Sequence, residues 1–247
     1  MTNDIGKQFI ELTKYEHLDP SPQSQGVPLP PLELAAEPST SLLDLPSPAN
    51  LQIPTLDLRQ AIEKRETSRV YSQTPLSLDE MAYLLWCTQG VKSVTDRPTT
   101  KRTVPSAGAR NAFETWLLVN RVQTLDSGLY RYLALSHQLA RLPADSNITG
   151  QLTTACLSQK HVMESGLTFI WVAVVERMTW RYPGRGYRYL FLDAGHICQN
   201  LYLAAQQIGC GVCAIAAFDD NLVNQAIQVD GENLFAVYLA TVGKLPH

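Results

Sequence analysis

The segment LTFIWVAVV at residues 167–175 is apolar except for one threonine, and β-branched and aromatic residues make up most of it. This composition predicts a strand that is buried on both faces, because a strand with one solvent-exposed face alternates apolar and polar residues. The segment is about half as long as the roughly 20 apolar residues that a membrane-spanning helix needs. It therefore predicts an inner strand of a covered sheet in a globular domain.

Helical and strand patterns surround this segment without a strict alternation of strand and helix. The sequence Ser77-Leu-Asp-Glu80 is a capping box and predicts a helix over residues 78–89. Residues 193–208 carry apolar side chains along one helical face, and Gly209 closes that helix. An α+β or α/β layered domain follows from this order of elements. Further helices are predicted over 57–65, 148–159 and 219–227, and further strands over 116–122, 129–135, 138–142, 212–218 and 235–242.

The first 50 residues differ in composition from the rest of the chain. Nine of the fifteen prolines precede residue 60, and residues 19–50 are rich in Pro, Ser and Leu without helical or strand periodicity. Such a segment cannot build a core by itself. Its spaced hydrophobic residues predict an extended arm that lies over a surface. We therefore divide the chain into a Pro-rich extended N-terminal arm, residues 1–50, and a folded domain, residues 51–247.

Charge and cysteine usage narrow the class of protein. The net charge of −3 favours neither nucleic acid nor an anionic membrane as partner. The opening sequence MTNDIGKQF lacks the apolar stretch of a secretory signal. Five cysteines are an odd number without framework spacing, which predicts free thiols and no disulfides. We expect a cytoplasmic protein.

Residues 181–196, RYPGRGYRYLFLDAGH, begin with arginines, tyrosines and glycines, then become mostly apolar, and end in a histidine. A basic helix for nucleic acid is disfavoured because Pro183, Gly184 and Gly186 interrupt the helical spacing of the arginines. A dinucleotide loop would need a preceding strand and a third glycine. A solvated loop and the wall of a binding site are the two interpretations that stay open.

Three other segments have features of anion or ring binding. RETSR at 65–69 offers two guanidiniums and two hydroxyls within five residues, which suits a phosphate monoester. PSAGAR at 105–110 is a small-residue turn whose backbone N–H groups can face a ligand. Residues 209–217 run small side chains into a strand and leave room for a flat ring. A capped turn, a loop and tight helix packing are the ordinary explanations of the same three segments.

The resemblance to a known family is carried by six segments in register: RETSRVY, PLSLDEMAYLLWCTQG, RTVPSAGARNAFETWLLVNRV, GLYRYLAL, RYPGRGYRYLFLDAGHICQNLYLAAQQIGCGVCAIAAFDD and YLATVGK. They resemble the nitroreductase-like FMN oxidoreductases, specifically the SagB-type dehydrogenase or azoline oxidase branch. The resemblance covers about residues 50–244, and the arm is also similar to the N-terminus of that branch. It implies an α+β, three-layer fold in which helices flank a central, mostly antiparallel sheet, with residues 51–247 as the FMN-binding domain.

The same resemblance implies a cofactor site. Members of the family bind FMN non-covalently at the interface of a homodimer, and both subunits contribute to each site. A segment of the Arg-x-Ser-x-basic type and a basic residue near the C-terminus hold the phosphate, the partner subunit supplies a Pro-Ser turn, and a backbone N–H of the strand after the long helix approaches flavin N5. Arg65, Thr67 and Arg69 match the Arg-x-Ser-x-basic segment, and Lys244 matches the basic residue near the C-terminus. The Pro-Ser turn is matched by Pro105, Ser106, Ala107 and Gly108, and the strand after the long helix by Ile215, Ala216 and Ala217.

One matching position departs from the branch. Azoline oxidases carry a Lys-Tyr pair just before this arginine-rich segment, and the candidate catalytic pair here is Arg181 and Tyr182. An arginine does not shed its proton at any reachable pH, so Arg181 cannot act as the general base that a buried lysine can be. Tyr182 keeps a hydroxyl that can act as an acid or relay. His196 is expected to be a hydrogen-bonded structural residue near the start of the long helix.

Three functional hypotheses follow. In the first, the protein is an FMN-dependent oxidoreductase that transfers hydride or electrons between a nicotinamide donor, NAD(P)H, or a heterocycle-bearing peptide and an acceptor. FMN then carries the redox chemistry while the protein orients a small-molecule or peptide substrate. In the second, the chain is a catalytically weak flavin-binding docking subunit of a peptide-modifying complex. In the third, Cys210-Gly-Val-Cys213 binds a metal or performs thiol redox chemistry.

Overall fold

Strand β7 (Leu167–Val174) lies inside a seven-stranded sheet, and all of its residues are buried. The computed structural model, which describes residues 4–97 and 99–246, pairs it on one side with β4 (Phe113–Val119) and on the other with β9 (Leu234–Lys244). Phe169 is opposite Leu117 in one ladder and Ala240 in the other. The prediction of a strand buried on both faces is confirmed.

The sheet has the strand order β1-β6-β5-β4-β7-β9-β8, and every ladder is antiparallel. Strand β8 forms one edge and pairs with β9 from Cys210 opposite Lys244 to Ile215 opposite Leu239. A separate two-stranded hairpin, β2 with β3, stands beside the sheet. The remaining strand bounds are β1 (Leu42–Asp44), β2 (Val91–Val94), β3 (Thr100–Arg102), β5 (Gly128–Leu133), β6 (Gln138–Arg141) and β8 (Cys210–Ile215).

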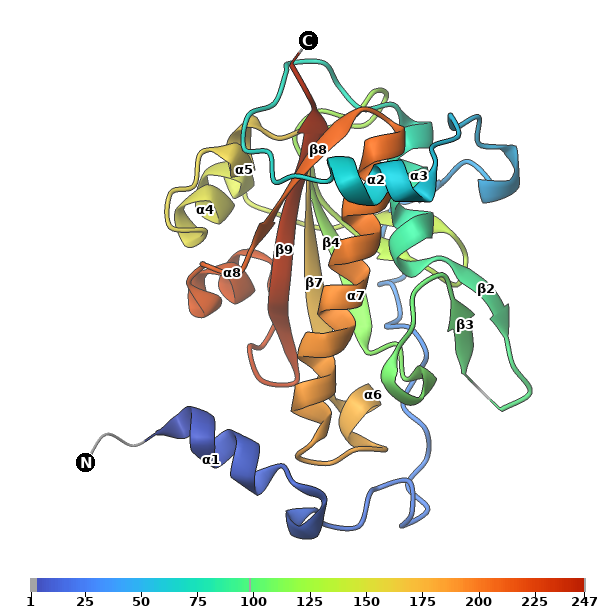
Figure 1. The fold of residues 1–247 in the computed structure, drawn as a ribbon, viewed down its shortest axis with the longest axis vertical. Coiled ribbons are helices and arrows are strands. Elements are labelled where there is room, and N and C mark those ends of the chain that lie inside the picture. Colours follow the sequence, from blue (N-terminus) through green and yellow to red (C-terminus); the bar gives the residue numbers. More distant parts are fainter. Residues whose placement is uncertain (1–3, 98, 247) are drawn as a thin grey trace.

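Helices cover both faces of the sheet (Figure 1). Alternate residues of β7 point to opposite faces. Phe169 and Trp171 join the core under α7 and α3, whereas Ile170 and Val172 join the core under α4 and α8. The result is the three-layer α+β arrangement that the sequence predicts. The helix bounds are α1 (Ile5–Leu12), α2 (Leu58–Lys64), α3 (Leu78–Gln89), α4 (Ile148–Ala155), α5 (His161–Glu164), α6 (Val175–Thr179), α7 (Gly186–Gln207) and α8 (Asp220–Ala226).

Helix α3 begins and ends where the sequence predicts. Ser77 Oγ accepts from the backbone N–H of Glu80 at 3.1 Å, and the Glu80 carboxylate accepts from the N–H of Ser77 at 2.9 Å. Both bonds satisfy backbone donors that the first helical turn leaves free. The capping box is therefore formed as expected.

Helix α7 is longer than the sequence predicts. It begins at Gly186, seven residues before the expected start at Asp193, so the prediction of its N-terminus is wrong. Gly186 fits there because a Cβ at this position would come within 3.1 Å of Met178 Cγ, and its N–H donates to the Tyr182 carbonyl at 2.7 Å. The longer helix also corrects the expectation for His196, which lies in mid-helix and is exposed.

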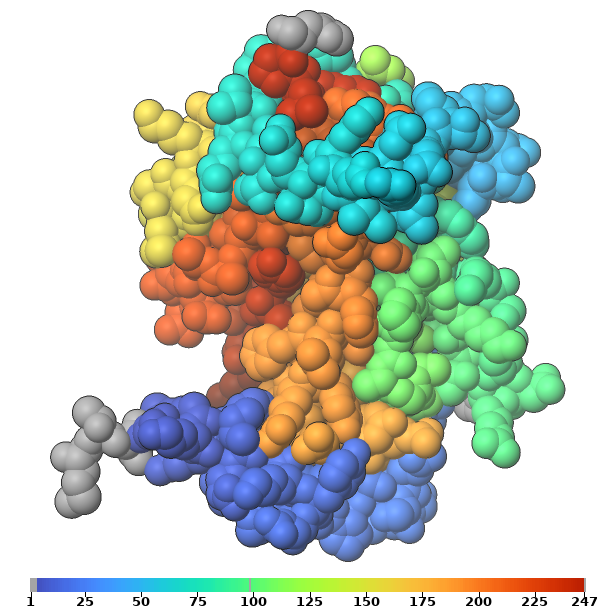
Figure 2. Space-filling model, viewed as in Figure 1, coloured from blue at the N-terminus to red at the C-terminus, as the bar shows by residue number. Residues whose placement is uncertain are grey.

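The N-terminal arm runs over the base of the domain, below α6 and α7 (Figure 2). Arg185 donates to the Thr13 carbonyl at 3.0 Å, the Trp180 indole donates to the Val27 carbonyl at 2.8 Å, and β1 pairs with β6 at the edge of the sheet. Sequence periodicity did not indicate α1, β1 or the β2–β3 hairpin. Among the described residues, no helix is long and apolar enough to cross a membrane.

Candidate active site

The RETSR segment lies against the C-terminal half of α7 and the edge strand β8. Thr67 forms an isolated parallel bridge with Val212, and Thr67 Oγ1 lies 3.1 Å from the hydroxyl of Tyr202 on α7. The same hydroxyl accepts from the N–H of Ala214 at 3.0 Å. The guanidinium carbon of Arg65 lies 5.4 Å from the centre of the Tyr202 ring. Tyr202 on α7 therefore links the RETSR segment, which is far away in sequence, to strand β8.

The two arginines of this segment carry charge that the described part of the chain does not neutralise. Neither Arg65 nor Arg69 forms an ion pair with a described carboxylate. Arg69 lies near Cys213, whose pKa is raised by burial and lowered less strongly by Arg69. Together with the Thr67 hydroxyl, these guanidiniums can hold a phosphate by charge-assisted hydrogen bonds. We call Arg65, Thr67, Arg69 and Tyr202 the arginine cluster.

Small residues of β8 and the loop after it make this cluster possible. A Cβ at Gly211 would lie 2.6 Å from Ser68 Cβ, so glycine lets the RETSR segment approach the strand. Ile215 is buried, whereas Ala216 and Ala217, which follow the end of β8, are exposed. Their small side chains leave the surface beside the arginine cluster open to a flat ring.

Two further basic or titratable groups lie at this end of the molecule. Lys244, at the end of β9, forms an ion pair with Glu80 and donates to the Ile208 carbonyl at 2.7 Å. Its charge is therefore already paired with a carboxylate. His161 on α5 is 5 % exposed, and its Nε2 has no hydrogen-bond partner in the described structure. Burial lowers the pKa of His161, and the nearby positive charge of Arg69 lowers it further.

The Pro-Ser turn lies against the N-terminal half of α7. Ser106 Oγ donates to Asp193 Oδ2 at 2.6 Å, and the N–H of Ala107 donates to Asp193 Oδ1 at 3.1 Å. Asp193 is 3 % exposed, and burial raises its pKa while the bonds from Ser106 and Ala107 oppose that rise. Sequence reasoning assigned no role to Asp193. Its carboxylate fixes the position of the turn, and Pro105 lies exposed at the start of that turn.

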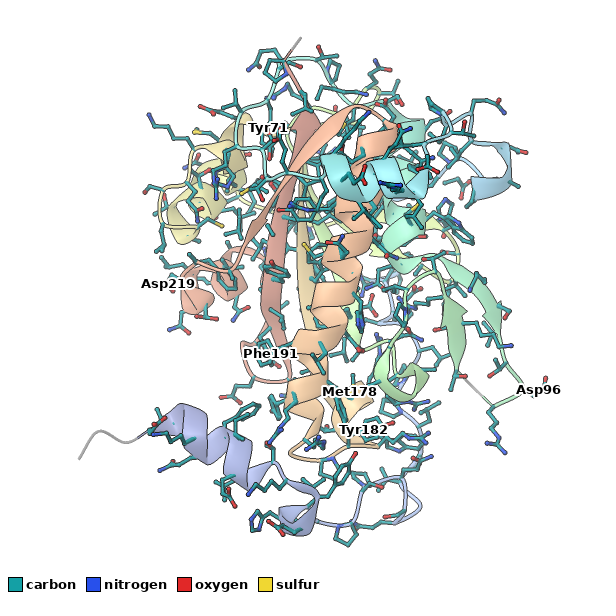
Figure 3. The ribbon with its side chains drawn as sticks, in the orientation of Figure 1. Tyr71, Asp96, Met178, Tyr182, Phe191 and Asp219 are labelled. Carbon is teal, nitrogen blue, oxygen red and sulfur yellow. The ribbon has the colours of Figure 1, made fainter. Side chains whose placement is uncertain are left out.

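The candidate catalytic pair packs on this turn. Gly108 has a φ of +56°, and a Cβ there would lie 2.5 Å from the Tyr182 hydroxyl and 3.1 Å from Arg181 Cδ. Tyr182 also contacts Tyr189 edge to face, with ring centres 4.9 Å apart. Arg181 is exposed, and Tyr182 is half-buried. The structure therefore brings Gly108, Arg181 and Tyr182 together beside the first turns of α7, as Figure 3 shows for Tyr182.

The turn and the arginine cluster lie on opposite flanks of α7. Their contact residues on that helix, Asp193 and Tyr202, are nine positions apart, which is about 14 Å along the axis and half a rotation around it. Figure 3 shows Tyr71, which follows the RETSR segment, near one end of α7 and Tyr182 near the other. One chain thus forms each half of the expected site but does not join the two halves.

A stripe of α7 between these flanks carries large apolar side chains in contact with solvent. Phe191 is 57 % exposed and Leu192 is 60 % exposed. Gly195 follows on the same face, and a Cβ there would meet nothing within 4 Å. We call Tyr187, Phe191, Leu192, Gly195 and His196 the open face of α7.

The paired cysteines lack the properties of a redox or zinc site. Cys210 and Cys213 are both buried, and burial raises the pKa of Cys210 to about 12. Reactive and metal-binding cysteines need the thiolate, which such a shift disfavours. Within the described ranges, the group of three side chains that can converge on a metal ion is Glu11, Glu16 and His17, exposed on the arm and far from these thiols in sequence.

The antiparallel sheet flanked by helices and the long helix α7 agree with the fold of nitroreductase-like oxidoreductases. The chain belongs to the nitroreductase family: the model of that family matches residues 62–244. A protein of Methanocaldococcus jannaschii that is named as a candidate nitroreductase, MJ1384, is 33 % identical over 182 residues, which cover 72 % of this chain and 89 % of that protein.

Relatives from peptide processing confirm the similarity to the SagB-type branch. The trifolitoxin-processing protein TfxB of Rhizobium leguminosarum is 28 % identical over 53 % of this chain. The microcin B17-processing protein McbC of Escherichia coli is 25 % identical over 55 % of this chain. The matched regions make up 36 % of TfxB and 51 % of McbC, so both relatives are longer than this chain.

Solved structures agree with this placement. A candidate nitroreductase from Anabaena variabilis matches 85 % of this chain and 42 % of its own, with a TM-score of 0.70 and 26 % identity. The Escherichia coli microcin synthetase McbBCD complex contains a chain that matches 87 % of this chain and 79 % of its own, with a TM-score of 0.62 and 19 % identity. At 19 % identity, the similarity to the chain of the McbBCD complex shows a shared fold.

Proposed function

We propose that the protein is an FMN-dependent oxidoreductase that transfers hydride or electrons between NAD(P)H or a heterocycle-bearing peptide and an acceptor. The observation that carries this proposal is the arginine cluster, where Arg65 and Arg69 have no carboxylate partner among the described residues and lie beside the small residues that follow β8. When bound, FMN supplies the hydride and electron chemistry. The free thiols of all five cysteines support a reducing, cytoplasmic compartment.

The residues of the arginine cluster fit a flavin phosphate. Arg65 lies over the Tyr202 ring, Arg69 lies near Cys213, and the Tyr202 hydroxyl fixes Thr67 relative to β8, so the two guanidiniums and the Thr67 hydroxyl would be available to a phosphate dianion. Ile215, Ala216 and Ala217 would offer backbone N–H groups and an unobstructed surface to the ring. Lys244 would add positive charge only if its pairing with Glu80 were weakened.

We further propose that two copies of the chain pair through the open face of α7. A two-fold axis at this face brings the Pro-Ser turn of one copy toward the arginine cluster of the other, since one chain holds them on opposite flanks of the helix. Pro105, Ser106, Ala107 and Gly108 would then complete the partner's cofactor site. Phe191 and Leu192 would lose their contact with solvent, which is a favourable change for apolar surface.

Arg181 and Tyr182 would orient the substrate at this completed site. Arg181 carries a fixed positive charge and cannot accept a proton, so it can bind an anionic group but not act as a base. Tyr182 can donate a hydrogen bond or a proton to a substrate atom from its hydroxyl next to Gly108. This arrangement favours reduction of a small organic acceptor over oxidation of an azoline.

The first experiment is the visible absorption spectrum of the purified protein, followed by heat release and identification of any flavin. We expect about one FMN per chain and reduction of that flavin by NADH or NADPH. A colourless protein that also takes up no added FMN would rule out the proposal. Flavin that is bound but reduced by neither nicotinamide nor an azoline peptide would reject the enzymatic role alone.

A docking subunit is the second candidate, favoured by the similarity to McbC and to a chain of the McbBCD complex. In that case activity would appear only with a partner protein, or after the substitution Arg181→Lys, which supplies a group that can lose its proton. Turnover by the purified chain alone would exclude this candidate.

A further inference from the structure

A cavity of about 710 Å³ lies beside the Pro-Ser turn, and four separate parts of the chain line it. The turn contributes Gly108, Ala109 and Arg110, and the end of α6 contributes Trp180 and Arg181. The arm and the loop of the β2–β3 hairpin close the remaining sides with Gln23, Leu29, Thr95, Asp96, Arg97 and Thr99. This volume lies in the range of pockets that bind small organic ligands.

The cavity has an excess of positive charge. Three guanidiniums, those of Arg97, Arg110 and Arg181, line it against the single carboxylate of Asp96. None of the three forms an ion pair in the part of the chain that the structure describes. Positive charges that share a concave surface raise the local concentration of anions there.

Arg110 is the most informative of these side chains because it is only 8 % exposed. Its Nε donates to the Gly108 carbonyl at 3.1 Å, and its guanidinium carbon lies 5.1 Å from the centre of the Trp180 ring. Its two terminal nitrogens form no hydrogen bond with any described residue. Burial lowers the pKa of Arg110, and the charge of Arg181 lowers it further, so a negative charge here would relieve both effects.

Two other buried arginines, Arg177 and Arg102, have carboxylates near their guanidiniums, whereas Arg131 donates only to the Ala35 carbonyl. Arg177 lies 2.7 Å from the Glu114 carboxylate and donates to the Pro31 carbonyl at 2.7 Å. Arg102 donates to Gln89 at 2.8 Å, and Glu114 and Glu33 both favour its charged form. Arg110 has no carboxylate partner among the described residues and lines a cavity together with Arg181, so an anion that enters the cavity can supply the missing negative charge.

We propose that this cavity binds the carboxylate of an organic acid, with Arg110 and Arg181 as its ligands. Guanidiniums match a carboxylate by parallel N–H donors, and Trp180 and Leu29 offer apolar surface to the rest of the molecule. Because the cavity shares Gly108 and Arg181 with the candidate active site, the acid is the substrate of the reaction. That last assignment rests on the proposed function, whereas binding of the acid does not.

The test compares two probes that differ in charge and little else: 4-nitrobenzoate and 4-nitrobenzamide. Titration calorimetry of the full chain at low salt should give a dissociation constant at least about tenfold lower for the benzoate, since a charge-assisted pair contributes on that scale. In Arg110→Gln and in Arg181→Gln, the dissociation constant of the benzoate should rise until it is close to that of the amide. The matched control Arg59→Gln, at an exposed position on α2, should keep the preference. Because Arg181 is exposed, its replacement should leave the fold intact even if replacement of the buried Arg110 does not.

Equal affinity for both probes, no binding of either, or a preference that survives both cavity variants would overturn the proposal. A second pair, acetyl-Glu-Glu-amide and acetyl-Gln-Gln-amide, shows whether the cavity that prefers the benzoate also prefers a peptide acid, and equal affinity for the two peptides would identify the ligand as a small acid. Flavin content is measured on the same samples. Binding of an acid by protein that contains no flavin and takes up no added FMN would uphold the cavity and reject the FMN proposal.

Discussion

The carboxylate of Glu114 lies 2.7 Å from Nη2 of Arg177, and both side chains are 3 % exposed. Glu114 is on β4, Arg177 is on α6, and the arm completes the cluster because the N–H of Leu34 donates to Glu114 at 2.9 Å and the Pro31 carbonyl accepts from Arg177. A buried ion pair thus fastens the arm to the sheet near the cavity.

Removing one member of this pair should destabilise the protein strongly. Glu114→Gln leaves the Arg177 charge buried without its counterion, which costs about 3–5 kcal/mol of unfolding free energy. Urea denaturation followed by fluorescence measures the change. The control is Asp126→Asn in the exposed pair with Arg141, where we expect a change within about 1 kcal/mol. Similar losses at both pairs would contradict the special role of the buried one.

A charge on the open face of α7 should separate the two copies of the chain. Leu192→Glu places a carboxylate where apolar surface would be buried, and sedimentation velocity should then report a monomer. Because each site would lack its partner's Pro-Ser turn, bound FMN should fall at the same time. Leu222→Glu on α8, at a position that is also exposed, should leave the dimer intact. A variant Leu192→Glu that stays dimeric would place the interface elsewhere.

The arginine cluster should determine FMN affinity. Arg65→Gln or Arg69→Gln removes one charge-assisted contact to the phosphate, and each such contact contributes about 1.5–3 kcal/mol, or roughly 10- to 150-fold in affinity. Fluorescence titration of the apoprotein with FMN provides the measurement, with Arg59→Gln as the control. If the two cluster variants bound FMN as the wild type does, the phosphate would have to be held by other residues.

His161 should make stability depend on pH. Its pKa in the folded protein is below the ordinary value of 6.5, so the unfolded chain binds more protons as pH falls below that value. The contribution of the neutral imidazole is present above pH 6.5 and is lost as pH falls toward the lowered pKa. Melting temperatures between pH 7.5 and 5 should therefore fall more in the wild type than in His161→Gln. Burial also lowers the pKa of His137, and its contribution to the pH dependence of stability is the same in the wild type and in His161→Gln. Parallel pH profiles of the two proteins would refute this role.

The sequence determined the elements whose signals are local. The apolar segment at 167–175 predicts β7 because period and composition report burial directly, and Ser77 with Glu80 predicts the start of α3 because a capping box is completed within one turn. The six segments in register also identified the family, since cofactor-binding turns keep short recognisable patterns. Thr67 contacts Tyr202 and Ser106 contacts Asp193, whereas the cofactor-binding role of these two segments stays a prediction.

Tertiary structure decided what depends on contacts between distant residues. The start of α7 at Gly186 follows from packing on Met178, β1 exists only by pairing with β6, and Tyr202 becomes a link because Thr67 and Ala214 meet its hydroxyl. The placement of the two halves of the site on opposite flanks of α7 has the same origin. Periodicity reports which face of an element is apolar, but the partner of that face, and any charge left unpaired in a cavity, are set by the whole chain once it is folded.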